Sequence, residues 1–482
     1  MQKISKEQVI QSFVWKLMER MGTQIVSLVV SIILARLLLP SDYGVIAIIT
    51  IFILIANVLV QSGFSQALVQ DQSVGEIDFS SVLYLSLLVA AVLYGSLFVC
   101  SPFIAMFYKE PLLSPVIRVL SVILFFGAFN SVQIAYISRH MLFKRLFFSS
   151  SVSSLFSGVV GIVLAFLKFG VWALVAQQIS SQAMICLVLW FTVKWRPQLV
   201  FSLKRVKKMF SFGWKLMVSG LLDTVFNNIQ SLIIGRLYNP SIVGYYNNGQ
   251  QFPGLIVTNV DTSIQSVMFP ALSSHQDNKE MVKQMMRRVI MTSSFIMFPA
   301  TLGLATIAQP LILLLLGAKW LPAVPFLQIA CLYYSVWPLQ TANLATINAL
   351  GYSSIFLKIE VIKKVVGIAI IIGSIPFGMY GIAWGMVLTS FISTFINAFP
   401  NKRLVSYAYF EQWKDIAPSL VLSIIACLVS YSISFTSMPA FLLLFTQVLV
   451  GLGIYLLLAK VFKLEEYQYL GNEIKNRFAK KV

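Results

Sequence analysis

The chain has 482 residues, of which 58% are hydrophobic and only 11% are charged, and its formal net charge is +19. Soluble domains carry about 25% charged residues, so this composition excludes a soluble protein and indicates a polytopic membrane protein. The positive charges lie between the apolar runs, as orienting charges do, and the sequence contains no basic soluble domain that would hold a nucleic acid.

Apolar runs follow one another along almost the whole chain. A membrane-spanning helix needs about 20 mostly apolar residues. By that measure the sequence predicts fourteen spans, centred on 20–39, 44–69, 80–107, 115–138, 147–167, 171–193, 212–237, 243–271, 289–316, 322–349, 355–376, 380–399, 416–435 and 439–462. The predicted fold class is therefore an all-α polytopic membrane protein with about 14 transmembrane helices.

One stretch of the sequence, residues 15–44, occurs twice. Both copies open with Trp-Lys-Leu-Met, beginning at Trp15 and at Trp214, and both close with Arg-Leu-x-x-Pro-Ser-x-x-Gly, ending at Gly44 and at Gly244. Six predicted spans precede the second copy, so both copies cross the membrane in the same direction. This predicts two six-helix lobes related by an axis along the membrane normal, the parallel-repeat arrangement of some transporters.

The repeat and the two spans beyond it define the predicted domains. They are an N-terminal lobe of six spans, a basic cytoplasmic linker, a C-terminal lobe of six spans, two further spans and a cytoplasmic tail, at 1–193, 194–211, 212–403, 404–462 and 463–482. Lys and Arg concentrate in the tails and the even-numbered connections, which predicts that both termini are cytoplasmic. The connection 71–78 is the exception, because it is acidic and has no Lys or Arg.

Charged residues within the spans are costly, at least about 2.5–3.5 kcal/mol each, and tend to line cavities. Lys16, Arg20 and Gln24 follow i, i+4, i+8 spacing and share one helix face, and Lys215 occupies the matching position in the second copy. We expect these four residues to line a substrate cavity between the lobes. In the alternative interpretation Lys16, Arg20 and Lys215 extend to the cytoplasmic head groups and have no binding role.

Three acidic residues are candidates for coupling transport to an ion gradient: Asp223, Asp261 and Glu360. Asp223 extends the polar stripe of the second copy, Asp261 lies in the middle of an apolar run, and Glu360 is spaced to form ion pairs with lysines on its own helix. A purely structural ion-pair cluster around Glu360 is the alternative. Arg36 and Arg236, at the outer ends of the repeat, have an expected structural or gating role, with capping of the helix end as the simplest account.

The remaining polar residues suggest no catalytic or metal site. The four cysteines lie in apolar runs without the spacing of a disulfide framework or a metal site, and both histidines lie in polar connections. We therefore predict no metal, no cofactor and no catalytic residue. Scattered amides within the spans, such as Asn57, Gln177, Gln178 and Gln182, are expected mainly to join helices.

Two motifs carry a resemblance to a known family. Ala35-Arg36-Leu37 with Pro40, Tyr43 and Gly44, and the later Leu316-Gly317-Ala318-Lys319-Trp320, resemble the polysaccharide-transporter (Wzx-type) oligosaccharide flippases of the multidrug/oligosaccharidyl-lipid/polysaccharide (MOP) superfamily. The similarity is greatest to the colanic-acid and teichuronic-acid exporter branch. It covers nearly the whole chain and implies a MATE- and MurJ-like fold.

The resemblance also implies an activity. Such a protein moves a polyprenyl-pyrophosphate-linked oligosaccharide from the cytoplasmic to the outer leaflet by alternating access of its two lobes, for the synthesis of exopolysaccharide, O-antigen, capsule or teichuronic acid. It implies a bacterial cytoplasmic (inner) membrane location, a lipid groove formed by the last two spans, Na⁺ or H⁺ coupling, and polysaccharide polymerase or export machinery as partners.

Two alternative functions are open at this stage. A cation-coupled multidrug antiporter of the MATE type would place carboxylates in its cavity, and the N-terminal lobe offers little besides Glu19. A membrane glycosyltransferase or polymerase would need a large outer loop or an acidic pair for a metal, and the sequence has neither a long loop nor an Asp-x-Asp motif.

Overall fold

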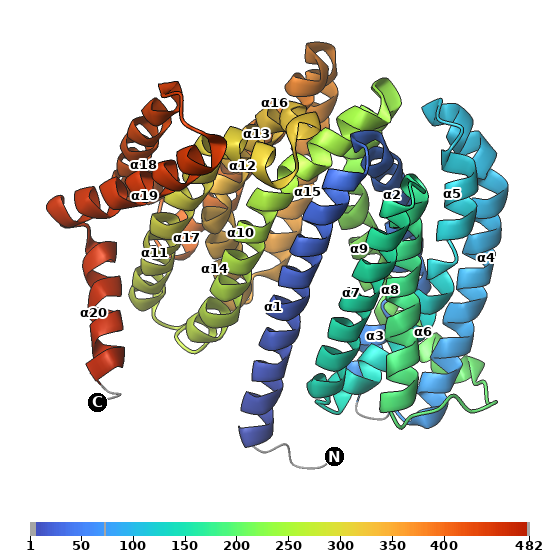
Figure 1. Cartoon of the computed structure of the whole chain (residues 1–482). Helices are drawn as coiled ribbons and strands as arrows, with labels where there is room; N and C mark the ends of the chain where they lie inside the picture. Colours follow the sequence, from blue (N-terminus) through green and yellow to red (C-terminus); the bar gives the residue numbers. More distant parts are fainter. Residues whose placement is uncertain (1–5, 72–73, 480–482) are drawn as a thin grey trace. The chain divides into compact units, whose positions relative to one another are not determined.

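The computed structural model describes residues 6–71 and 74–479, and in this part of the chain every regular element is a helix. The chain divides into two compact units, Met1–Gly244 and Tyr245–Val482. Each unit is a bundle of helices, coloured from blue to green in the first and from green to red in the second (Figure 1).

Among its described residues, the first unit contains nine helices and the start of a tenth. They are α1 (Lys6–Leu37), α2 (Pro40–Gln61), α3 (Phe64–Gln70), α4 (Glu76–Tyr108), α5 (Leu113–Leu120), α6 (Ile123–Arg139), α7 (Phe143–Phe166), α8 (Val171–Thr192), α9 (Leu203–Leu237) and the first turn of α10 (Pro240–Ser273). Helix α7 packs between α1 and α8, and α2 contacts α6, α8 and α9.

The second unit holds the rest of α10 and the helices that follow it. They are α11 (Lys279–Thr306), α12 (Ala308–Leu315), η1 (Ala318–Ala323), α13 (Val324–Ser335), α14 (Trp337–Ala349), α15 (Ser353–Ser374), η2 (Ile375–Phe377), α16 (Gly378–Ala398), α17 (Asn401–Leu404), α18 (Tyr409–Ser432), η3 (Ile433–Phe435), α19 (Ala440–Val461) and α20 (Glu465–Ala479). Helix α11 packs against α13, α14 and α18, and α18 packs against α19.

Every predicted span coincides with a helix or with a pair of helices separated by a short break. The break between α2 and α3 lies at Ser62 and Gly63, which both have positive φ angles of 44° and 69°. In the described part of the chain, nine helical segments are long and apolar enough to cross a membrane. This is a multi-pass membrane protein of the predicted all-α class, and the count of fourteen spans stays a prediction.

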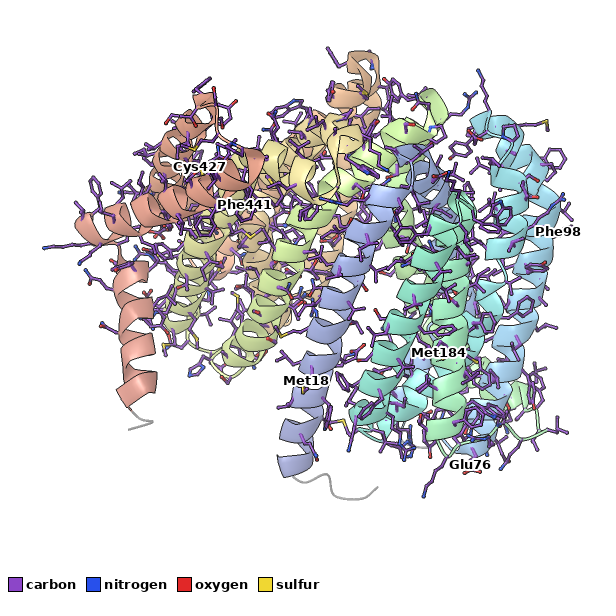
Figure 2. All side chains as sticks on the ribbon, viewed as in Figure 1. Met18, Glu76, Phe98, Met184, Cys427 and Phe441 are labelled. Carbon is purple, nitrogen blue, oxygen red and sulfur yellow. The ribbon has the colours of Figure 1, made fainter. Side chains whose placement is uncertain are left out.

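The outer surfaces of the helices agree with a membrane environment. Phe98 on α4 and Phe441 on α19 project away from their helices and are 42% and 67% exposed (Figure 2). Large apolar side chains exposed in this number would form an aggregating surface in water, whereas lipid chains cover them without cost. Polar contacts lie at helix ends, as between Arg205 and Asp78, and between buried helix faces, as between Asn343 and Gln412.

Both copies of the sequence repeat lie in the first unit, and their closing motifs pack against each other. A methyl group on Gly44 would overlap the backbone of Pro240, and one on Gly244 would overlap the carbonyl oxygen of Pro40. Each proline is the first residue of its helix, where its missing N–H leaves no hydrogen bond unmade. Glycine permits this close approach of two backbones, so the repeat forms a reciprocal crossing of α2 and α10 at their first turns.

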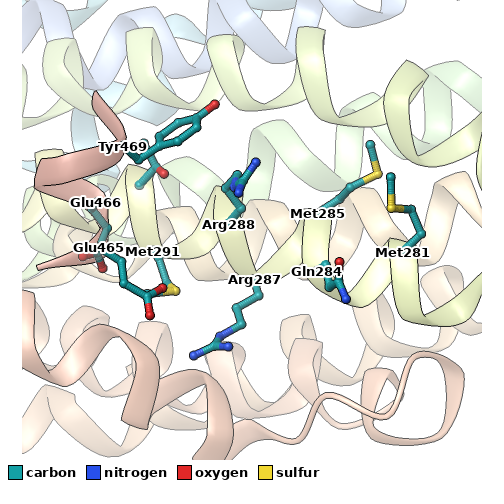
Figure 3. Close-up of a pocket in the computed structure, with 10 residues that line it drawn as sticks. Met281, Gln284, Met285, Arg287, Arg288, Met291, Glu465, Glu466 and Tyr469 are labelled. Atoms are coloured by element: carbon teal, nitrogen blue, oxygen red, sulfur yellow. The ribbon is translucent and has the colours of Figure 1, made fainter. Parts of the chain in front are cut away.

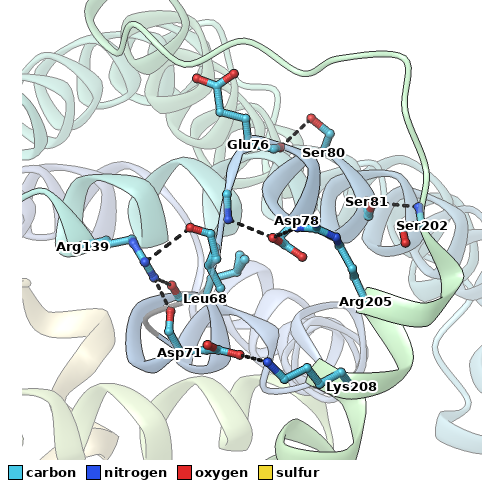
Figure 4. Close-up of polar contacts among 12 residues, drawn as sticks. Leu68, Asp71, Glu76, Asp78, Ser80, Ser81, Arg139, Ser202, Arg205 and Lys208 are labelled. Carbon is cyan, nitrogen blue, oxygen red and sulfur yellow. Dashed lines mark hydrogen bonds and ion pairs between the residues drawn. The ribbon is translucent and has the colours of Figure 1, made fainter. Parts of the chain in front are cut away.

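The acidic connection 71–78, the exception to the predicted distribution of Lys and Arg, forms ion pairs with residues of the basic linker (Figure 4). Arg205 Nη1 donates to Asp78 Oδ2 at 2.6 Å, and Lys208 Nζ donates to Asp71 Oδ2 at 2.7 Å. The carboxylate of Asp78 also accepts the Gly75 N–H at 2.8 Å and so caps the start of α4. From the other side, Arg139 donates to three main-chain carbonyls at the end of α3 and beyond it, those of Leu68, Asp71 and Val74. Negative charge here holds the first turns of α9 against α3 and α4.

Asp78→Ala is expected to destabilise the protein by about 2–4 kcal/mol, because it removes a helix cap and a charge-assisted hydrogen bond at a buried carboxylate. The matched control is Lys208→Ala. That lysine side chain is 65% exposed, and a surface ion pair contributes at most about 1 kcal/mol. Thermal unfolding of the two purified variants is the measurement, and equal midpoints would contradict the assignment.

Candidate functional site

A polar pocket of about 470 Å³ lies inside the first unit. It is formed by α1, α2, α7 and α8, with one residue from α6. Its lining residues are Glu19, Thr23, Ser27, Val30, Thr50, Ile53, Leu54, Asn57, Ile123, Ser150, Ser153, Ser154, Ser157, Gln177, Gln178, Ser181, Gln182 and Ile185. Twelve of these eighteen residues carry a hydroxyl or an amide group, and among the described residues that form the lining only Glu19 is charged.

Local sequence explains why these groups gather here. The helix α7 carries a run of serines, and Ser150, Ser153, Ser154 and Ser157 are spaced by one and by three or four residues, so they lie along one side of the helix. Small side chains on that side also allow close packing: a methyl group on Gly161 would meet the Gln177 side chain at 3.0 Å. The serine-rich face thus both joins α7 to α8 and leaves space beside them.

Some of the lining groups are already occupied by helix-to-helix hydrogen bonds. Ser153 donates to the Ser181 carbonyl oxygen at 2.7 Å, which ties α7 to α8. Asn130 Nδ2 donates to the Gln182 side-chain oxygen at 3.1 Å, which ties α6 to α8. These bonds are the helix-joining role that the sequence predicted for its buried amides.

Three other amides are not occupied in this way. Within the described part of the chain, the side chains of Asn57, Gln177 and Gln178 have no hydrogen-bond partner, and all three face the pocket and are partly exposed. Each amide offers both donors and an acceptor. Polar groups inside a membrane protein that do not bond to other helices bond to water or to a ligand, so these are the groups available to a bound molecule.

The predicted cationic stripe lies beside this pocket. Lys16 donates to Glu19 Oε2 at 2.9 Å, and Glu19 itself lines the pocket. Arg20 and Gln24 lie on the following turns of α1 and are partly buried, but among the described residues that line the pocket neither is present. Lys215 is exposed on α9. The structure therefore brings the predicted cavity residue Lys16 into contact with the pocket lining.

The three predicted coupling residues lie on separate helices. Asp223 is exposed on α9, and Glu360 on α15 forms an ion pair with Lys363. Asp261 on α10 accepts hydrogen bonds from Thr341 on α14 and from Gln265. In the described ranges, no group of three or more His, Cys, Asp or Glu side chains is placed to hold a metal ion.

The two repeat arginines lie near the crossing of α2 and α10. Arg36 is exposed in the last turn of α1. Arg236 occupies the same position of α9, and its guanidinium lies 4.8 Å from the ring centre of Phe107 on α4. The carboxylate of Asp42 accepts the Leu39 N–H at 2.9 Å and caps α2.

Sequence comparison identifies the family. The family described as "Polysaccharide biosynthesis protein" matches residues 33–325, which include the end of the first repeat copy and the whole of the second. The chain belongs to this family. Its predicted recognition as a member of a polysaccharide-transporter family is confirmed, and so is the prediction of a membrane transporter.

Individual relatives extend the match over most of the chain. The chain is 26% identical over 416 residues to the teichuronic acid biosynthesis protein TuaB of Bacillus subtilis (strain 168), covering 84% of this chain and 85% of TuaB. It is 24% identical over 410 residues to the lipopolysaccharide biosynthesis protein WzxC of Escherichia coli (strain K12), covering 83% and 82%. Its fold is similar to that of the lipid II flippase MurJ in an inward closed conformation, with a TM-score of 0.77, 16% identity, and coverage of 93% of this chain and 98% of MurJ.

Proposed function

We propose that this protein is a flippase that moves a lipid-linked oligosaccharide from the cytoplasmic to the outer leaflet for surface polysaccharide synthesis. The observation that carries the proposal is the pocket of the first unit, where twelve of the eighteen lining residues carry a hydroxyl or an amide group. Support also comes from the family match, from relatives named for teichuronic acid and lipopolysaccharide biosynthesis, and from the likeness of the fold to a lipid II flippase.

The chemistry of the pocket suits a sugar. Sugar hydroxyls are neutral groups that both donate and accept hydrogen bonds, as do the free amides of Asn57, Gln177 and Gln178. The pocket volume of about 470 Å³ lies within the range of about 300–1,000 Å³ that small-molecule sites occupy. We infer that one or more sugar residues of the cargo bind here.

The same lining argues against an organic-cation cargo. Binding of a lipophilic cation favours aromatic faces and free carboxylates. Among the described residues that line the pocket there is no aromatic side chain, and the single carboxylate, Glu19, is paired with Lys16. The multidrug antiporter alternative is therefore the weaker of the two.

The rest of the proposed mechanism completes this assignment. The cations Lys16, Arg20 and Lys215 attract the pyrophosphate, and Gln24 contributes to the same face of α1. The two lobes of the repeat, 1–193 and 212–403, alternate access to the two leaflets, with both termini in the cytoplasm and the protein in the inner membrane. Asp223, Asp261 or Glu360 couples the cycle to Na⁺ or H⁺, and the exported glycan passes to a polymerase or export complex.

Removal of the free amides tests the sugar site. Asn57→Leu together with Gln178→Leu removes two neutral hydrogen-bonding groups, each worth about 0.5–1.5 kcal/mol, so we expect the rate of glycolipid export to fall about tenfold. The control is Gln66→Leu, an exposed amide on α3 outside the pocket. Surface polysaccharide and cytoplasmic-leaflet glycolipid are measured in cells that depend on the variant. Full export by the double variant, at normal protein level, would refute the sugar site.

A further inference from the structure

A second pocket, of about 340 Å³, lies in the second unit between α11 and α20 (Figure 3). Helix α20 presents Glu465, Glu466 and Tyr469 to it, and α11 presents Met281, Gln284, Met285, Arg287, Arg288, Met291 and Thr292. The pocket is therefore lined by both acidic and basic side chains, together with three flexible methionine side chains. The proposed transport function makes no use of this pocket.

Glu466 is the unusual residue of this pocket. It is only 4% exposed, yet its carboxylate has no ion pair and no hydrogen bond to another residue in the part of the chain that the structure describes. Burial raises the pKa of this carboxyl, and the nearby charges of Glu465 and Asp415 raise it further, while Arg287 acts in the opposite direction. A buried carboxylate is stable in its charged form only beside a cation, so a ligand with a positive group would satisfy Glu466.

Arg287 does not supply that cation, because it is already engaged. Its Nε and Nη2 donate to the two carboxylate oxygens of Asp415 at 2.9 and 2.8 Å, a two-pronged pair that fixes the guanidinium. The hydroxyl of Tyr407 also donates to Asp415 Oδ2, at 2.6 Å. The pair ties α11 to the start of α18 and commits the guanidinium of Arg287 to Asp415.

Arg288 is the available cation. Its guanidinium lies 4.7 Å from the ring centre of Tyr469, and among the described residues it has no carboxylate partner. Tyr469 thus positions the guanidinium without neutralising it. Among the described residues, Arg288 on α11 and the buried Glu466 on α20 face the same pocket without an ion-pair partner, so the pocket is complementary to a ligand that carries both charges.

The position of the pocket in the chain indicates where such a ligand resides. Helix α20 follows directly on α19, which is one of the nine segments long and apolar enough to cross a membrane. The start of α20 therefore lies at the level where a span ends and lipid head groups begin. The side chains of Leu464, Tyr467 and Leu470 pack α20 against α18 and α19 through the cluster around Tyr455 and Ala459, which holds the helix at that level.

We propose that this pocket binds the head group of an aminophospholipid, a zwitterion with a phosphate and a primary ammonium group. The ammonium lies beside Glu466, the phosphate beside Arg288, and the glycerol and first acyl carbons contact Met281, Met285 and Met291. A choline head group has no N–H to donate to the carboxylate, and a glycerol head group brings no cation to it. The lipid joins α20 to α11 and so becomes part of the C-terminal packing.

Lipid binding to the purified full-length protein tests this assignment by native mass spectrometry. Phosphatidylethanolamine, phosphatidylcholine and phosphatidylglycerol with identical acyl chains are titrated separately. We expect the ethanolamine lipid to bind about tenfold more tightly than either other lipid, the factor for one charge-assisted hydrogen bond. Glu466→Gln should reduce it to the level of the choline lipid, and Arg288→Gln should weaken all three phosphate-bearing lipids.

Asp277→Asn is the matched control, because Asp277 is an exposed carboxylate just before α11 that lies outside the described pocket lining, and its loss should leave the preference intact. Equal affinity of the wild-type protein for the three lipids would overturn the proposal, as would an ethanolamine preference that survives in Glu466→Gln. If Glu466→Gln does not fold, the affinity of Arg288→Gln for the three lipids tests the pocket independently. Displacement of the lipid by an equal concentration of soluble O-phosphoethanolamine would show that the ligand is a free amine phosphate and would overturn the lipid assignment.

Discussion

Gly44→Ala is expected to destabilise the protein by about 3 kcal/mol or more and to reduce the amount of folded protein in the membrane. The added methyl group would overlap the backbone of Pro240, and a backbone atom cannot rotate away as a side chain can. Overpacking of a tight contact costs about 1–3 kcal/mol even where side chains relax. In a helix interior, alanine is more favourable than glycine by about 1 kcal/mol, and this gain offsets only part of the cost. Thermal unfolding of the purified protein measures the effect.

Two further glycine variants make the result specific. Gly244→Ala should have a similar effect, because its methyl group would overlap the carbonyl oxygen of Pro40. Gly95→Ala, in α4 of the same unit, is the control, since a methyl group there has open space around it and should leave the midpoint unchanged or raise it. If Gly44→Ala unfolds at the same temperature as Gly95→Ala, the crossing is not a tight backbone contact.

Lys16→Ala together with Arg20→Ala is expected to lower glycolipid export at least tenfold and to accumulate glycolipid in the cytoplasmic leaflet. Each cation is proposed to make charge-assisted contacts with the cargo pyrophosphate, worth about 1.5–3 kcal/mol apiece. Export of surface polysaccharide and the leaflet distribution of the glycolipid are the measurements. If both side chains merely extend to the head groups, export by the double variant will equal that of the wild-type protein.

The ion pair between Lys16 and Glu19 permits a sharper version of this experiment. Removal of Lys16 leaves the Glu19 carboxylate unneutralised at the edge of the pocket, and that charge alone would repel an anionic cargo. Adding Glu19→Gln to the double variant removes it. We expect the triple variant to remain defective, because its cations are still missing. Recovery of export would show that Lys16 and Arg20 act only by neutralising Glu19.

The helices were predictable from the sequence because each carries its own signal. About 20 apolar residues have to form a helix in a membrane, since no water is present to satisfy the backbone groups. The breaks within predicted spans were harder to place. The break at Ser62 and Gly63 depends on two residues with positive φ angles. Only the glycine is a sequence signal for such a backbone conformation, because serine rarely adopts it. The repeat was visible because its glycines and prolines are fixed by a backbone contact.

The pocket was less predictable, because it depends on which helix faces meet. Gln178 and Gln182 are one turn apart on α8. Gln182 is bonded to Asn130 on α6, whereas Gln178 has no hydrogen-bond partner among the described residues, and only the packing of α6 separates the two roles. The serines of α7 offered the missed signal. Four serines lie on one face of this span, and all four line the pocket. A row of hydroxyl groups of this kind in an apolar helix is therefore a signal for a polar pocket. The roles of Arg20, Gln24 and Lys215 stay predictions.

The reciprocal contact at Gly44 and Gly244 has the form of an isologous interface. In a two-fold dimer, residue i of one subunit contacts residue j of the other, and j contacts i in return. Here glycine meets proline and proline meets glycine across two copies of one motif within a single chain. Two separate half-length chains bearing this motif would bring the same atoms together as a homodimer. The contact between the two copies of the motif thus has the geometry of a subunit interface, although it lies within one chain. A substitution in either copy changes a surface against which the other copy packs.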